Sequence, residues 1–149
     1  MQIIPYLGGI VLVSALVVLM AGLAGLASRA LRPRVTVALM LMAVFATMIF
    51  FNYAVQTTFV PTLIGQPDMG NRALLAALSM SNPDSLGWAL EMWGWGFFGV
   101  ATALVAPVFE GGHLARATRW AFYANGVVSV AGTIWTALDP EPRDPGPPR

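Results

Sequence analysis

The stretch SLGWALEMWGWGFFGVATALVAPVF, from Ser85 to Phe109, decides the fold of this chain. It is long and apolar enough to cross a lipid bilayer as a helix, yet it contains one acidic residue, Glu91. A charged side chain at the centre of a membrane helix costs about 2.5–3.5 kcal/mol on insertion scales, so it requires a partner, a proton or water. The segments that surround this carboxyl group therefore define the fold.

The composition of the whole chain points to a membrane protein. Of its 149 residues, 57% are hydrophobic and only 10% are charged, and the mean hydropathy is +0.70. Soluble domains usually have about 25% charged residues, so most of this chain is expected to meet lipid. At about 20 apolar residues per crossing, the length allows four crossings with short connections. The sequence therefore predicts an all-α, integral membrane four-helix bundle.

The apolar runs predict a single transmembrane domain over residues 1–138, with crossings at about residues 3–27, 35–63, 86–109 and 120–138. Residues 139–149 are rich in proline and charge and are expected to form a disordered tail. In the second connection the stretch ALLAALSM is too short to span, and we expect a short interfacial helix there, capped by Asn71. We expect Pro61 to end or kink the second crossing.

The first apolar run could be either a membrane crossing or a cleaved signal peptide. Signal peptides begin with positive charge and have an apolar centre of about 7–15 residues. Here the start, MQIIPYLGG, has no charged side chain and the run is longer, which favours a crossing. Small residues at helical spacing on this run allow another helix to approach closely, either inside the chain or from a second copy. They are Ser14, Ala21, Gly25 and Ser28.

The arginines predict the orientation in the membrane. All eight basic residues are arginines; three lie in the first connection and two in the third, whereas the second has only Arg72 beside two acidic residues. The positive-inside rule then places the first and third connections in the cytoplasm and both termini outside. The absence of lysine and the abundance of Ala, Gly and Pro suggest a GC-rich bacterial genome, so we expect a multi-pass protein of the bacterial cytoplasmic (inner) membrane.

The residue inventory argues against an enzyme. The chain has no cysteine, which excludes disulfides, thiolate metal sites and cysteine nucleophiles. His113, the only histidine, lies among glycines and arginines in the third connection, where we interpret it as a solvated loop residue. The serines therefore have no intramembrane histidine to activate them. We predict no catalytic residue, no metal site and no cofactor.

Polar residues of the other crossings are the candidates for surrounding Glu91. On a helical wheel of the third crossing the bulky residues lie opposite Glu91, so its carboxyl group should face the bundle interior. The second crossing carries two amide side chains four residues apart at a similar depth, and the fourth carries a polar stripe. The candidate polar site comprises Glu91, Asn52, Tyr53, Gln56, Asn125 and Ser129.

Two further features of the third crossing lie outside this site. A ridge of small residues suits a neighbouring helix and consists of Gly96, Gly99, Ala103 and Ala106. Three tryptophans near the start of the crossing are interpreted as interface aromatics, and they are Trp88, Trp93 and Trp95.

The candidate polar site has two interpretations. In the first, its side chains line a hydrated cavity or a substrate site open to the outside, with Glu91 as its charge. In the second, they form interhelical hydrogen bonds, which are worth about 0.6 kcal/mol on average in membranes. An intramembrane carboxyl is costly and glutamine or leucine would pack more cheaply, which favours function for Glu91. For the amides and serines the structural interpretation is favoured.

The motif NYAVQ in the second crossing, together with NPDSLGWALEMWGWGFFGVATALVAPVF and the basic loop after it, resembles a set of small bacterial polytopic membrane proteins of unknown function. The resemblance covers about residues 45–138. Those proteins often continue with further helices, whereas this chain continues into a proline-rich segment. The resemblance implies the membrane class and no activity.

Taken by function, the sequence favours a non-enzymatic helix bundle that acts as a subunit or accessory of a membrane assembly. The alternative is a small-solute or proton-coupled transporter or channel component that uses the polar site around Glu91. An intramembrane enzyme is a distant third. The expected partners are the lipid bilayer and either further copies of the chain or other membrane subunits, and no basic cluster large enough to grip nucleic acid occurs.

Overall fold

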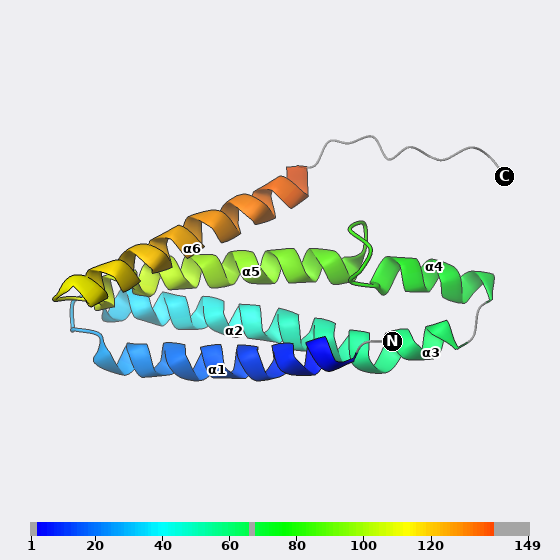
Figure 1. The fold of residues 1–149 in the computed structure, drawn as a ribbon, viewed down its shortest axis with the longest axis horizontal. Coiled ribbons are helices and arrows are strands. Elements are labelled where there is room, and N and C mark those ends of the chain that lie inside the picture. The colour runs from blue at the N-terminus through cyan, green and yellow to red at the C-terminus, as the bar shows by residue number, and fades with distance from the viewer. Residues whose placement is uncertain (1–2, 66–67, 139–149) are drawn as a thin grey trace.

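The computed structural model describes residues 3–65 and 68–138, and every regular element in them is a helix (Figure 1). The elements are α1 (Ile4–Leu26), α2 (Arg32–Ala54), a π-helical segment η1 (Val55–Phe59), α3 (Val60–Ile64), α4 (Met69–Leu78), α5 (Leu86–Val105), a 3-10 segment η2 (Ala106–Val108) and α6 (His113–Leu138). The predicted tail, residues 139–149, lies outside the described residues.

Among the residues that the structure describes, four helices are long and apolar enough to cross a membrane; every regular element there is helical, as predicted, and these four helices support a multi-pass membrane protein. They are α1, the continuous helix from Arg32 to Ile64, the helix from Leu86 to Val108, and α6. The second has 33 residues, so at about 1.5 Å per residue it is longer than a hydrocarbon core of about 30 Å is thick. Its last turns, with α4 beside them, therefore extend past the core at one end of the molecule (Figure 1).

The helices pack in the order in which the chain visits them. α2 packs against α1 and α5, and α5 packs against α6 (Figure 1). The core lies along α2 and α5, where Phe45, Ile49, Ala101 and Val105 are fully buried. α6 spreads away from α5 toward its C-terminal end (Figure 1). A closed four-helix bundle thus stays a prediction, because α1 and α6 lie at the two edges of this arrangement.

Small residues let α5 and α6 touch. A Cβ atom on Gly99 would lie 2.5 Å from Cβ of Ser129, and one on Gly96 would lie 2.5 Å from Oγ1 of Thr133. Gly126 on α6 has the same role, because its Cβ would lie 2.8 Å from that of Ala103. The small-residue ridge predicted on this crossing is therefore used inside the chain. On α1 the predicted small residues Ser14, Ala21 and Gly25 are exposed instead, and a Cβ on Gly22 or Gly25 would meet nothing within 4 Å.

The long second helix passes Pro61 without ending. Proline lacks the amide N–H and its ring clashes with the carbonyl four residues earlier, which disrupts an α-helix. Here η1 widens the turn just before Pro61, so that Val60 N–H bonds the Val55 carbonyl, and Pro61 falls in the first turn of α3. The π-helical turn therefore accommodates Pro61, and the helix continues without a break.

The predicted cap of α4 is wrong, and the helix that contains the predicted fourth crossing begins before that crossing. α4 is capped by Asp68, whose side chain accepts from the backbone N–H of Asn71 at 2.7 Å, so Asn71 lies within the helix instead of capping it. α6 begins at His113, seven residues before the predicted start at Trp120. The basic stretch after the glycines is helical, and Arg119 donates back to the Phe109 carbonyl.

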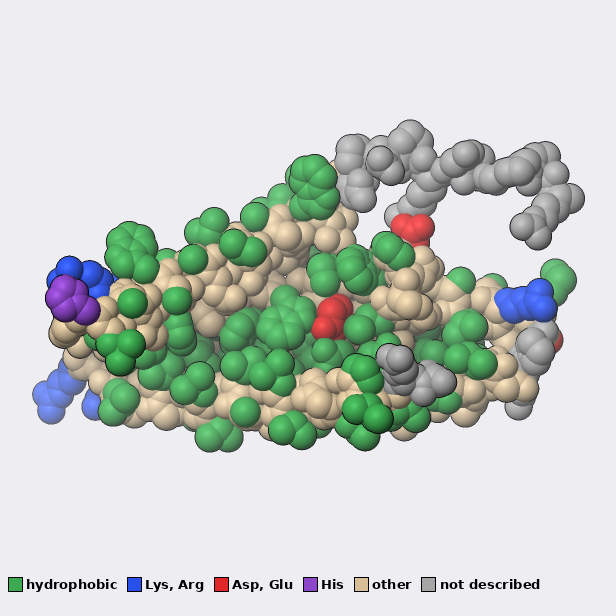
Figure 2. Space-filling view, viewed as in Figure 1, with side chains coloured by type: hydrophobic (Ala, Val, Ile, Leu, Met, Phe, Trp, Pro, Cys, Tyr) green, Lys and Arg blue, Asp and Glu red, His purple; other side chains and the backbone are tan. Residues whose placement is uncertain are grey.

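Basic side chains lie at the ends of the molecule. Figure 2 shows apolar side chains along the length of one face, arginines at both ends, the histidine at one end, and acidic side chains between the ends. We call the end with the α1–α2 and α5–α6 connections the arginine end, and the opposite end the α4 end. The orientation of these ends across a membrane stays a prediction.

Candidate functional site

The Glu91 carboxyl group is buried between α5 and α2 near the α4 end, with 7% of the residue exposed. Its Oε1 accepts from the Tyr53 hydroxyl at 2.9 Å and from the Trp95 indole N–H at 2.9 Å. Its Oε2 accepts from the Asn52 amide at 3.1 Å. All three donors are uncharged, and both oxygens of the buried carboxyl accept hydrogen bonds.

Backbone atoms fix the direction of this hydrogen-bond network. The Gln56 amide nitrogen donates to the Leu78 carbonyl at 2.8 Å, and its oxygen accepts from Met80 N–H at 3.1 Å. A carbonyl only accepts and an N–H only donates, so Gln56 has one orientation. It then donates to the Asn52 oxygen at 3.3 Å, which turns the Asn52 nitrogen toward Glu91.

As a result, the groups that face the Glu91 carboxyl are hydrogen-bond donors. The Asn52 nitrogen also donates to the Gly87 carbonyl at 3.0 Å, and this second acceptor excludes the flipped amide. The Trp95 indole can only donate. Two carboxyl oxygens that both accept fit this arrangement, and glutamine in their place would turn an NH₂ group toward one of the donors.

Glycines allow the segments around Glu91 to approach. A Cβ on Gly87 would lie 2.5 Å from the Leu78 carbonyl oxygen and 3.1 Å from the Gln56 amide nitrogen. A Cβ on Gly9 of α1 would lie 2.3 Å from the Tyr53 ring. The network thus depends on backbone packed directly against side chains at these two positions.

Aromatic rings surround the remaining sides of the carboxyl group. Trp95 packs on Phe45 and on Phe98, with ring centroids 5.1 Å and 5.5 Å apart. On the α1 side, Tyr6 meets Tyr53 edge to face at 5.5 Å. Rings from α1, α2 and α5 therefore pack on the residues that bind Glu91.

The structure divides the six candidate residues into two groups. Asn52, Tyr53 and Gln56 join Glu91 in one network, as described above. The other two lie on α6, where the Asn125 amide donates to the Thr102 hydroxyl at 2.9 Å and Ser129 packs on Gly99. These two residues join α6 to α5 and have no part in the hydrogen bonds of Glu91.

Sequence analysis missed several partners of this network. Trp95 had been assigned to the membrane interface, although it lies four residues after Glu91, a spacing that brings two side chains together on a helix. The contributions of Leu78 and Met80 come from backbone atoms, which leave no signature in residue type.

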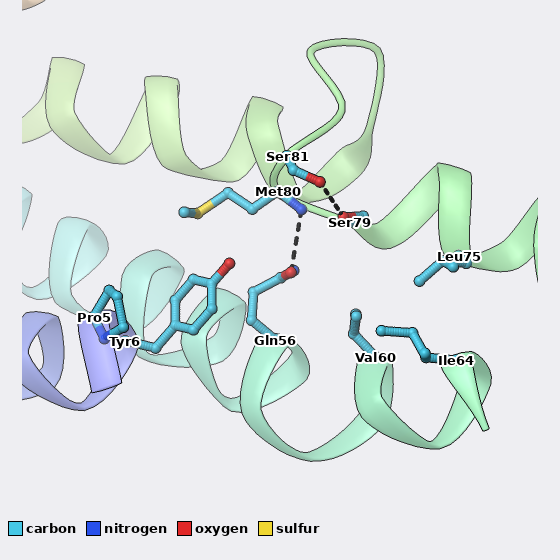
Figure 3. Close-up of a pocket in the computed structure, with 9 residues that line it drawn as sticks. All are labelled: Pro5, Tyr6, Gln56, Val60, Ile64, Leu75, Ser79, Met80 and Ser81. Atoms are coloured by element: carbon cyan, nitrogen blue, oxygen red, sulfur yellow. Dashed lines mark hydrogen bonds between the residues drawn. The ribbon is translucent and has the colours of Figure 1, made fainter. Parts of the chain in front are cut away.

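A pocket of about 430 Å³ lies beside the network at the α4 end (Figure 3). Gln56 and Tyr6 belong to its wall, so it is separated from Glu91 by side chains that contact the carboxyl group's own partners. Among the residues that the structure describes, no cluster of three potential metal ligands occurs. No protein-family model, curated protein or solved structure matches the chain.

Proposed function

We propose that this chain is a non-enzymatic membrane protein that acts as a subunit or accessory of a larger membrane assembly, in a bacterial cytoplasmic membrane with both termini outside. The observation that carries the proposal is the closed network around Glu91. Glu91, the acidic residue within these membrane helices, makes its three hydrogen bonds with neighbours in the chain, and those with Asn52 and Tyr53 join α2 to α5. Such a group acts as a structural link.

The edge helices support an assembly role. Only 17% of the most apolar window of α1 and 11% of that of α6 is buried, against 50% for the α5 crossing. α1 also has open space at Gly22 and Gly25, where another helix would approach closely. These surfaces need lipid or a partner helix to cover them.

Copurification in mild detergent tests this proposal. We expect a stable second membrane protein, or further copies of the chain, to copurify with the tagged full chain. Gly25→Phe should abolish this copurification. The added ring projects into open space, so it blocks a close helix contact without touching the chain's own core. Leu12→Phe, at an exposed position about 140° around the same helix, is the matched control and should leave the complex intact. A monomer without partners would contradict the proposal.

A small-solute or proton-coupled role is the second candidate, and the pocket beside Gln56 favours it. Uptake into liposomes that contain the purified chain, and its loss in a Glu91→Gln variant that is still folded in the same liposomes, would establish this role in place of the first. Four helices rarely enclose a pore by themselves, so transport would also require an oligomer.

A further inference from the structure

The pocket at the α4 end is built from three separate segments of the chain. The first turn of α1 supplies Pro5 and Tyr6, and η1 with α3 supplies Gln56 and two aliphatic side chains. The third wall is the end of α4 and the residues after it (Figure 3). In Figure 3 the Tyr6 side chain extends from α1 toward Gln56 and Met80.

Hydroxyl groups are the polar atoms that this pocket offers. Both ends of the Gln56 amide are occupied by backbone atoms, as the dashed line to Met80 shows on one side (Figure 3). Ser79 and Ser81 share one hydrogen bond of 2.8 Å, which leaves one hydroxyl hydrogen of the pair free to donate. The Tyr6 hydroxyl has no hydrogen-bond partner within residues 3–65 and 68–138. Hydroxyls both donate and accept, so they suit an uncharged polar group.

The rest of the lining is apolar and offers no charged side chain to an ion. None of the described residues that line the pocket is charged, and aliphatic or thioether walls come from Val60, Ile64, Leu75 and Met80. The nearby Glu91 carboxyl already accepts three hydrogen bonds and is not part of the wall. An ion placed here would lose its water without gaining a counter-charge.

The position of the pocket fits a ligand that comes from the membrane interface. Gln56 lies 24 residues after Arg32 on one continuous helix, about 36 Å away, which is just beyond a hydrocarbon core of about 30 Å. The volume is within the range of about 300–1,000 Å³ usual for small-molecule sites. Gln56 also belongs to the π-helical segment η1, a feature that often occurs at functional sites.

We propose that this pocket binds an uncharged amphiphile with a hydroxyl or carbonyl head and a short apolar body. The Tyr6 hydroxyl and the Ser79–Ser81 pair hold the head, and the aliphatic walls hold the body. This inference goes beyond the subunit role, which would stand if the pocket bound nothing.

Photolabelling of the full chain in phospholipid nanodiscs tests the proposal, with an octanol that carries a diazirine as the probe. We expect labelled peptides from the first turn of α1 and from residues 79–81. Leu75→Trp should fill the pocket and abolish the labelling, whereas Leu74→Trp, at an exposed position outside the lining, should not. Tyr6→Phe keeps the ring and removes the hydroxyl, and should weaken labelling about threefold to tenfold, the range that one neutral hydrogen bond is worth.

Unlabelled competitors that share the eight-carbon chain of the probe but differ in head group show which head group the pocket binds. Unlabelled octanol should protect the pocket, and octanoate and octyltrimethylammonium should not. Protection by dioctanoylglycerol as well would identify a membrane lipid as the ligand, and protection by octanol alone a free small molecule. Stronger protection by octyltrimethylammonium than by octanol, or labelling that Leu75→Trp and Leu74→Trp change equally, would overturn the proposal.

Discussion

Gly87 shows how closely single residues constrain the Glu91 network. It lies on α5 one turn before Glu91, and its missing side chain lets the Leu78 carbonyl and the Gln56 amide approach the helix. The Leu78 carbonyl in turn fixes the orientation of Gln56, and Gln56 fixes that of Asn52. A change at Gly87 therefore acts on Glu91 through two intervening side chains.

We expect Gly87→Ala to destabilise the chain by about 1–3 kcal/mol, since a Cβ 2.5 Å from a backbone oxygen forces the segments apart. Gly22→Ala on α1 is the matched control: its Cβ meets nothing, and alanine favours a helix over glycine by up to about 1 kcal/mol. Unfolding by SDS titration in detergent micelles, followed by tryptophan fluorescence, measures both. Equal stability of the two variants would show that the close approach at Gly87 is not required.

The sequence was sufficient to find some residues of the site and not others. The amides of the second crossing could be predicted because a four-residue spacing places them on one helix face at the depth of Glu91. Asn125 and Ser129 also share one face of their helix by spacing, but that helix is α6, and they contact α5 instead of Glu91. Whether α6 reaches the site depends on how the helices are ordered in space. Side-chain periodicity within one helix has no information about that order.

At the scale of elements, helix interiors were predictable and helix ends were not. Long apolar runs identify the four membrane helices because lipid requires every backbone group to be bonded within the helix. The ends depend on single hydrogen bonds, as the start of α4 shows, where Asp68 and Asn71 were equally suited to cap by residue type. Likewise, the basic stretch before Trp120 has no apolar signal, although it is helical from His113.

The cap of α4 gives a prediction at this scale. Asp68→Ala should destabilise α4 by about 0.5–2 kcal/mol, because the N–H of Asn71 loses its acceptor. Asn71→Ala keeps that backbone N–H and should cost less, so it serves as the comparison. Amide hydrogen exchange of residues 69–78 measures the local stability. Faster exchange in Asn71→Ala than in Asp68→Ala would contradict the assignment of the cap.

At the scale of the whole molecule, the arginine end and the α4 end are expected on opposite sides of the membrane. Five arginines lie in the α1–α2 connection and in the first turns of α2 and α6, and they should hold the arginine end in the cytoplasm. Reporter fusions after Leu31 and after Ala115 should therefore report a cytoplasmic position, and a fusion after Met69 an external one. A cytoplasmic signal at Met69 would reverse the orientation.

The Glu91 network also belongs to this scale, because it links α2, α5 and the segment after α4 near one end of the molecule. If the carboxyl group is a structural link, its loss should weaken the whole fold. The two informative changes are Glu91→Gln, which keeps the shape, and Glu91→Leu, which leaves the Asn52, Tyr53 and Trp95 donors without their acceptor. Glu110→Gln, at an exposed position, is the control.

The free energy of unfolding of these three variants, from SDS titration of the full chain in detergent micelles, is the most direct measurement. Each buried donor left unpaired costs about 1–3 kcal/mol, so Glu91→Leu should lose the most. Glu91→Gln should lose about 1–3 kcal/mol, because its NH₂ group meets a donor, and Glu110→Gln should match the unmodified chain. A Glu91→Leu variant as stable as the unmodified chain, or more stable, would contradict the structural role of Glu91.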